Sequence, residues 1–179
     1  AEIHKNASRL TQAITDILRL FELESVDQST IKTEQMDLYD IADSCLLSLE
    51  MLAEKKGISL HLTPSHLLVS ANKEMMEQLI FNLVDNAIRY GRENGHIWIR
   101  LNDCLQVADD GPGIPEKDLP YIFERFYRVD KEESRKRGGT GLGLAIVKNI
   151  ADIHHADLYV TSEPDKETVF TLVFPSEID

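Results

Sequence analysis

The first 25 residues carry apolar side chains at alternating spacings of four and three. Such a heptad stripe is typical of a helix that packs against other helices in a bundle or coiled coil. One helix cannot bury this stripe alone, so we expect a partner helix, from another copy or from a part of the protein outside this chain. The polar segment 26–35 then indicates a linker. The stripe consists of Ile3, Ala7, Leu10, Ile14, Ile17 and Phe21.

Beyond residue 35 the apolar positions recur with helical periodicity in three segments. These are 36–57, 72–91 and 142–154. Asp37 and Asn72 stand where an N-cap side chain is expected, and Gly57 and Gly91 stand where helices commonly end. A fourth, shorter helix is predicted near residues 117–126.

Short runs rich in β-branched and aromatic residues predict six strands. They cover 58–62, 67–71, 96–101, 104–109, 157–162 and 168–174. Turn-forming residues separate the members of each successive pair. Because helices and strands are mixed without regular βαβ alternation, we predict an α+β fold. Its architecture would be a two-layer sandwich with helices on one face of a largely antiparallel sheet, preceded by the one long helix.

The charge balance narrows the range of partners. Asp and Glu number 31 against 19 Lys and Arg, which gives a net charge of −12. An acidic surface repels the nucleic-acid backbone and anionic lipid headgroups, so we expect no nucleic-acid partner and no direct membrane contact from this chain. Cys45 and Cys104 are far apart in the sequence and are interpreted as reduced thiols in a cytoplasmic protein.

The first candidate site is the glycine loop "VADDGPGIP" at the end of a predicted strand. Its Asp109 carboxylate only accepts hydrogen bonds, so if buried it needs a donor such as the exocyclic amine of adenine. The alternative is an aspartate that simply initiates a turn before glycine.

A second glycine cluster, Gly139, Gly141 and Gly143, directly precedes a helical segment. It fits neither the P-loop nor the dinucleotide-binding pattern. Glycines let backbone N–H groups approach an anion, and the positive end of the helix dipole adds to the attraction, so we predict a phosphate site. The loop before the cluster is either a cationic phosphate-binding segment or a solvated loop of mixed charge. Its cations are Arg125, Arg128, Lys131, Arg135, Lys136 and Arg137.

The helix "NLVDNAIRY" supplies a third set of polar groups. Asn82 and Asn86 are four residues apart and therefore share one helical face. An asparagine oxygen is a suitable ligand for Mg²⁺, although asparagines that bond neighbouring backbone are the alternative. Arg89 and Tyr90 add a phosphate donor and a flat ring for a base.

Together these stretches resemble the ATP-binding domain of sensor histidine kinases in two-component systems. That domain belongs to the superfamily of DNA gyrase, the Hsp90 chaperones and MutL. The resemblance covers roughly residues 36–175, and four boxes in the family's order carry it: "NLVDNAIRY", "DDGPGI", "IFERFYR" and "GGTGLGLAIV". It implies a sandwich of the Bergerat type in residues 36–179, a linker in 26–35, and in 1–25 the second helix of a dimerisation hairpin whose first helix is absent.

The resemblance also implies roles for individual residues. Asn86 would bind Mg²⁺, with Asn82 close by. Arg89 would reach the phosphates of ATP, and Tyr90 would lie against the adenine. Asp109 would accept a hydrogen bond from the adenine amine.

The two glycine loops and the segment between them complete the implied site. The adenine pocket would be shaped by Gly111, Gly113 and Ile114. Phe126 and Arg128 would belong to a mobile lid from about residue 114 to residue 138, which closes over nucleotide. The phosphates would lie on the segment Gly139, Thr140, Gly141, Leu142, Gly143 and Leu144. The chain departs from the family pattern at His154, His155 and Ala156, where His-Gly-Gly is usual.

Asn82 also bears on the reaction. Gyrase-like and chaperone-like members have a glutamate at this position as the base for water, and an amide cannot take that proton. We therefore predict transfer of the ATP γ-phosphoryl group to a histidine, for relay to an aspartate of a response regulator. The alternative is an ATP-hydrolysing conformational machine, or a domain that only docks partners.

The acceptor histidine is not found in this chain. His4 is followed by Lys5, and the fifth residue after it is Arg9, so the family's acceptor sequence is missing. The resemblance implies a homodimer in the full-length protein, a receiver-domain partner and a cytoplasmic location, with a parent protein that is anchored in the membrane in many members.

Overall fold

The computed structural model describes residues 2–130 and 139–175. Its helices are α1 (Glu2–Ser25), α2 (Leu38–Glu54), α3 (Lys73–Tyr90) and α5 (Gly143–Ile153), with 3-10 turns at Gln28–Thr30 and Leu119–Tyr121. Its strands are β1 (Glu34–Asp37), β2 (Ser59–Leu62), β3 (Leu68–Ala71), β4 (His96–Leu101), β5 (Leu105–Asp109), β6 (Asp157–Glu163) and β7 (Glu167–Val173).

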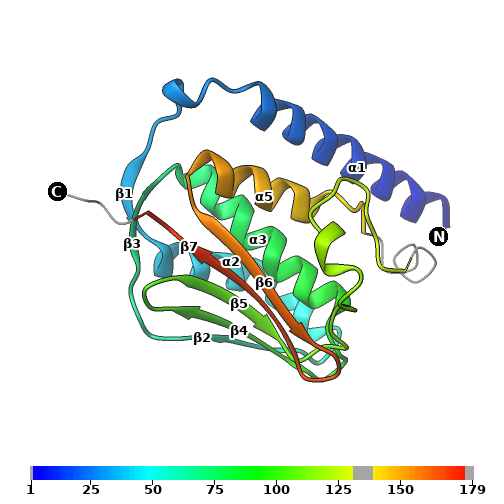
Figure 1. The fold of residues 1–179 in the computed structure, drawn as a ribbon. Helices are drawn as coiled ribbons and strands as arrows, with labels where there is room; N and C mark the ends of the chain where they lie inside the picture. The colour runs from blue at the N-terminus through cyan, green and yellow to red at the C-terminus, as the bar shows by residue number, and fades with distance from the viewer. Residues whose placement is uncertain (1, 131–138, 176–179) are drawn as a thin grey trace.

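The main sheet has five strands in the order β2-β4-β5-β7-β6. Strand β2 runs parallel to β4, and the other neighbours are antiparallel. Helices α2, α3 and α5 cover one face of this sheet, and α1 lies along α5 as a further helix (Figure 1). The predicted two-layer α+β sandwich with a largely antiparallel sheet and a preceding long helix is thus confirmed.

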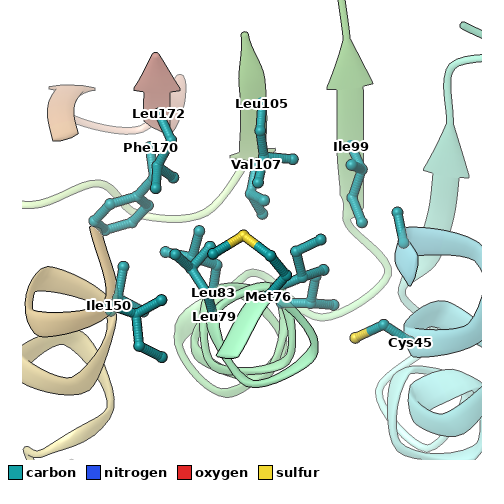
Figure 2. Packing of buried hydrophobic residues seen from close by; sticks show 14 of the residues in the cluster. Cys45, Met76, Leu79, Leu83, Ile99, Leu105, Val107, Ile150, Phe170 and Leu172 are labelled. Atoms are coloured by element: carbon teal, nitrogen blue, oxygen red, sulfur yellow. The ribbon is translucent and has the colours of Figure 1, made fainter. Parts of the chain in front are cut away.

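The core lies between α3 and the middle of the sheet. Met76, Leu79 and Leu83 point from α3 toward Ile99 and Val107 of the strands (Figure 2), and all five side chains are almost fully buried. Burying each such side chain stabilises the fold by about 1.5–3 kcal/mol. This packing fixes the rotation of α3, so the helix presents its polar side in a defined direction.

The helix starts follow the predicted caps. The Asp37 carboxylate accepts a hydrogen bond from the Tyr39 N–H, and the Asn72 side chain accepts one from the Met75 N–H. Gly57 has a φ of 67°, the left-handed conformation that favours glycine after a helix. Local side-chain chemistry therefore sets where α2 and α3 begin.

His154 ties the end of α5 to the start of α3. Its Nδ1 lies 2.8 Å from the Ile150 carbonyl, and its Nε2 accepts a hydrogen bond of 3.0 Å from the Asn72 N–H. These partners require the neutral ring with its proton on Nδ1. Burial lowers the pKa of His154, which favours the same neutral form.

The structure adds detail to two predicted regions and corrects a third. The segment 26–35 is more than a linker, because it contains a 3-10 turn and the start of β1, which pairs antiparallel with β3. The strands on either side of the turn 63–66 belong to different sheets. The helix expected near 117–126 is reduced to the 3-10 turn Leu119–Tyr121, and Phe126 at the end of that range has a φ of 63°, outside the right-handed helical region.

Helix α1 packs on the domain with a face next to its predicted stripe. Leu20 and Leu23 are buried against the core, and Ile17 is partly buried. In contrast, Leu10 and Phe21 of the stripe are 64% and 62% exposed. Within the described residues, no helix combines the length and the apolar character needed to cross a membrane.

Candidate nucleotide-binding site

A cavity of about 310 Å³ opens between α3, the loop after β5, the segment 122–130, the start of α5 and helix α1. Residues from distant parts of the sequence therefore meet in one place. Twelve predicted site residues line it: Asn82, Asn86, Arg89, Tyr90, Gly113, Ile114, Arg128, Gly139, Thr140, Gly141, Gly143 and Leu144.

The second glycine cluster forms the end of the cavity at the N-terminus of α5. Gly143 is the first residue of that helix, and the preceding Leu142 makes no side-chain cap bond. The Leu142 N–H instead donates to the Thr140 hydroxyl at 3.3 Å. Because the first N–H groups of a helix have no intrahelical acceptors, this end of the cavity attracts an anion.

Gly141 brings this loop against the end of the "IFERFYR" segment. Its φ is 76°, and a Cβ there would lie 2.9 Å from the Cα of Phe126. The Phe126 N–H donates to the Gly141 carbonyl at 2.9 Å, and Phe126 itself has a φ of 63°. A side chain at position 141 would therefore separate two segments that are hydrogen-bonded to each other.

Asn82 lies beside this cluster on α3. Its side-chain nitrogen is buried and has no hydrogen-bond partner among the described residues. A buried N–H donor without a partner carries an energetic cost, which a phosphate oxygen would remove. Asn86 lies one turn further along the same helix and also lines the cavity.

Arg89 lines the cavity together with a carboxylate that it binds. Its Nε donates to the Asp85 carboxylate at 2.6 Å, and Asp85 is a lining residue that the sequence reasoning missed. The spacing i, i+4 on a helix was the available signal. This ion pair holds the guanidinium on the side of α3 that faces the cavity.

Asp109 lies behind the cavity lining. The side chain is 8% exposed, and Oδ1 accepts a hydrogen bond of 2.9 Å from the Gly111 N–H. Burial raises the pKa of Asp109 to about 6. Thr168, opposite Asp109 on β7 and 4% exposed, adds a second buried polar group that the sequence reasoning missed.

Four predicted site residues thus lie outside the lining. They are Asp109, Gly111, Phe126 and Leu142. Gly111 and Leu142 are buried, whereas Phe126 is exposed. Leu142 contributes to the hydrophobic core and not to the cavity wall, because its side chain points inward from the start of α5.

The described part of the predicted lid is held by an internal hydrogen bond. The Tyr127 hydroxyl donates to Asp118 Oδ1 at 2.6 Å, which raises the pKa of Tyr127 to about 12. Tyr127 and Ile122 line the cavity and were not predicted. The predicted lid cations Lys131, Arg135, Lys136 and Arg137 lie outside the described residues.

Helix α1 contributes two lining residues that sequence reasoning did not find. The Thr140 hydroxyl donates to the Asp16 carboxylate at 2.7 Å, and Gln12 donates to the same carboxylate at 2.7 Å. Further along, Arg19 bonds Gln78 of α3 at 2.6 Å. An acid of α1 therefore contacts the glycine cluster itself.

The comparison with known proteins agrees with this geometry. Residues 71–178, well over half of the chain, match the family described as histidine kinase-, DNA gyrase B- and HSP90-like ATPases. The chain belongs to this family. The match includes the three asparagine- and glycine-bearing segments that meet at the cavity, and it leaves out the two lining residues of α1.

Two relatives of this chain are named as sensor histidine kinases. The chain is 34% identical over 176 residues to the signal transduction histidine-protein kinase ArlS of Staphylococcus epidermidis, covering 96% of this chain and 38% of that protein. It is 36% identical over 184 residues to the sensor histidine kinase YkoH of Bacillus subtilis, covering 98% of this chain and 38% of the relative. The chain thus spans about 38% of the length of these relatives.

A solved member of the family supports the fold. The mycobacterial sensor histidine kinase MprB superposes with a TM-score of 0.67 at 28% sequence identity, covering 80% of this chain and 97% of that structure. The ATP-binding domain of histidine kinases is thus shown for this chain, and the other classes of protein within the same superfamily are not favoured.

Proposed function

We propose that this chain binds Mg-ATP in the cavity and catalyses transfer of the γ-phosphoryl group to a histidine. The observation that carries the proposal is the meeting of the buried Asn82 side-chain nitrogen, which has no hydrogen-bond partner among the described residues, with the helix end at Gly143. A Cβ on Gly143 would lie 3.6 Å from Asn82 Oδ1, so the two elements are in contact. One donor set from α3 and one from α5 would thus converge on phosphate.

The adenine would lie at the other end of the cavity. Gly113, Ile114 and Tyr90 line that region, and Asp109 lies behind it. To accept a hydrogen bond from the exocyclic amine, directly or through water, the Asp109 carboxylate would weaken the hydrogen bond that it accepts from the Gly111 N–H. Binding at neutral pH would favour the ionised carboxylate, because an ionised group is the better acceptor.

Asn86 fits a magnesium site of the kind that uses few protein ligands. Mg²⁺ usually retains several waters and binds phosphate oxygens with one or two protein oxygens. Asn86 would supply that oxygen, and the metal would neutralise charge on the phosphates as the γ-phosphoryl group leaves. Arg89 and Arg128 would add positive charge from the walls of the cavity.

Phosphoryl transfer is favoured over hydrolysis because position 82 carries an amide. An amide orients a ligand but cannot remove a proton from water. The lining carboxylate on α3, Asp85, is already paired with Arg89. The site therefore offers positioning and charge neutralisation, which are the main requirements of phosphoryl transfer.

The remaining roles follow from the same proposal. Residues 1–25 would be a helix of the dimerisation hairpin, 26–35 its connection and 36–179 the catalytic domain. The exposed side of α1 with Leu10, Ile14 and Phe21 would pack against hairpin helices in a homodimer. A histidine on that hairpin would accept the phosphoryl group in the cytoplasm and pass it to the receiver domain of a response regulator.

The first test is nucleotide binding by Asn86→Asp. The variant places a charge where Mg²⁺ and phosphate would meet, and we expect loss of at least about tenfold in affinity for a fluorescent ATP analogue with Mg²⁺. Asn102→Asp adds the same charge on the exposed β4–β5 turn and serves as the control. Wild-type affinity in Asn86→Asp would remove Asn86 from the site.

The second test separates kinase from hydrolase. The chain is incubated with Mg-ATP, quenched in alkali and measured by intact mass, while released phosphate is followed in parallel. We expect bound nucleotide, little phosphate release, and a phosphoryl adduct only on an added histidine-bearing hairpin. Steady phosphate release that Asn82→Ala abolishes would instead identify a hydrolase.

A further inference from the structure

A cluster of ring side chains lies on the outer face of the sheet, outside the nucleotide cavity. His61 comes from β2, and His96 and Trp98 come from β4. The Nε2 atom of His61 lies 3.0 Å from the Nδ1 atom of His96. Both histidine rings stack on Trp98, with ring centroids 5.7 Å and 5.6 Å from the indole. None of these residues lines the nucleotide cavity.

The strand pairing explains why the two histidines meet. His61 is opposite Trp98, and Ser59 is opposite His96, in the parallel β2–β4 pair. The side chains of β4 alternate, so His96 and Trp98 face outward while Ile97 between them is buried. The two imidazoles are thus held on adjacent strands by backbone pairing, and both remain exposed to solvent.

We propose that His61 and His96 form a binding site for a divalent transition-metal ion such as Cu²⁺, Ni²⁺ or Zn²⁺. Two imidazole nitrogens about 3 Å apart have the spacing of neighbouring ligands on one ion, given metal–nitrogen bonds of about 2.0–2.1 Å. One ring now donates a proton to the other, and the metal would replace that proton. A rotation of each exposed ring about its soft χ2 torsion directs both lone pairs at the ion.

The site would be open and exchangeable. Across the described residues, no group of three or more His, Cys, Asp or Glu side chains gathers to hold a metal. Water would therefore fill the remaining coordination positions of the metal ion. Cu²⁺ would bind more tightly than either Ni²⁺ or Zn²⁺. The bound ion would link the edge strand β2 to β4, so it would stabilise the edge of the sheet.

The fluorescence of Trp98 provides a direct signal for metal binding at this site. It is the single tryptophan of the sequence, and it contacts both histidine rings. Cu²⁺ or Ni²⁺ bound between the rings would quench its fluorescence, whereas Zn²⁺, which has a filled d shell, would compete without quenching. The experiment titrates each metal salt alone into the protein in a non-chelating buffer near neutral pH.

The variants are chosen to separate the pair from other histidines. His61→Gln and His96→Gln keep a polar side chain but remove one imidazole, and we expect each to raise the midpoint of quenching at least about tenfold, because chelation by two rings is lost. His155→Asn is the control, since His155 is exposed and has a φ of 53°, which asparagine tolerates. Wild-type titration is expected from this variant.

A thermal scan gives an independent measurement that does not use fluorescence. Zn²⁺ should raise the unfolding temperature of the wild type and of His155→Asn, but not of His61→Gln or His96→Gln. Quenching and a Zn²⁺ shift that both glutamine variants retain would overturn the proposal, and so would the absence of quenching in the wild type. Far-UV circular dichroism shows that each variant is folded, so that a loss of binding is assigned to the ligand and not to the fold.

Discussion

The two glycine loops contribute differently to one cavity. The loop after β5 is held from within the catalytic domain. The Asp109 carboxylate accepts the Gly111 N–H, and Gly113, with a φ of 80°, lies against Pro164 of the β6–β7 turn. The Ile114 N–H donates to the Ser162 hydroxyl at 2.8 Å. The sheet and its turns therefore determine the shape of this loop.

The loop before α5 is shaped by partners on separate elements. Thr140 bonds Asp16 of α1, and Gly141 bonds Phe126 at the end of the "IFERFYR" segment. A Cβ on Gly139 would lie 2.6 Å from the Tyr90 hydroxyl. Its geometry depends on α1 and on the described part of the lid. In the proposed binding mode, the adenine end would thus be fixed by the fold, and the phosphate end would respond to movements of those two elements.

The largest expected effect comes from Gly113→Ala. A Cβ at this position would lie 2.9 Å from the Pro164 Cα, and the positive φ adds strain. We expect a loss of about 1–3 kcal/mol in the free energy of unfolding, together with loss of detectable nucleotide binding, measured by thermal unfolding and by titration with a fluorescent ATP analogue.

Gly143→Ala is the matched control from the other loop. Its Cβ would have 3.6 Å to Asn82 Oδ1, an ordinary contact, and alanine favours a helix start over glycine. We expect unchanged or slightly raised stability. If Gly113→Ala and Gly143→Ala destabilise the fold equally, the loop after β5 is not more tightly constrained by its surroundings than the loop before α5.

Asp109→Asn should change the stability of the fold and its affinity for nucleotide in opposite directions. A carboxyl group whose folded-state pKa, about 6, exceeds its ordinary value of 3.8 contributes stability below about pH 4 and loses it as the pH rises through 6. At neutral pH the buried charge therefore costs stability. The amide should raise the free energy of unfolding at pH 7.5 by on the order of 1–3 kcal/mol, while nucleotide binding is lost.

The pH dependence of this stability gain tests whether burial of the ionised carboxylate causes it. The stability gain of Asp109→Asn should shrink as the pH falls from 6 towards 4 and vanish well below 3.8, where the wild-type carboxyl is neutral in both states. Asp103→Asn, in the β4–β5 turn, removes the same charge from the surface and should show no such gain. A gain that is constant from pH 4 to pH 7.5 would contradict burial of the ionised group as its cause.

The sequence predicted the parts of this molecule that local chemistry determines. Asp37 and Asn72 cap their helices as expected, because capping requires only a side chain and the next two or three N–H groups. The adjacency of Asn82 to the second glycine cluster was expected only through the resemblance to a family. No spacing in the sequence states that α3 and α5 touch.

Features that depend on distant pairing were missed. Strand β1 exists because residues 34–37 pair with 68–71, and its own four residues carry little strand pattern. The contribution of Asp16 to the cavity depends on how α1 lies on α5, which its heptad stripe did not indicate. The stripe identified a face for other helices, whereas Leu20 and Leu23 provide the contact within this chain.

The smallest expected effect, from Asp16→Asn, tests whether α1 opposes nucleotide at the phosphate end. The Asp16 carboxylate lines the cavity and accepts the Thr140 hydroxyl, so it would repel the phosphates of ATP. Because the group is partly exposed, solvent screens this repulsion, and we expect affinity for the ATP analogue to rise only about two- to tenfold. The gain should shrink at high salt. Glu24→Gln removes an acid of α1 that pairs with Arg125 outside the cavity lining and is the control. An equal gain in affinity in both variants would mean that undocking of α1, and not the charge beside the phosphates, limits nucleotide binding. A gain confined to Asp16→Asn would instead mean that the Asp16 carboxylate of α1 competes with ATP for the second glycine loop.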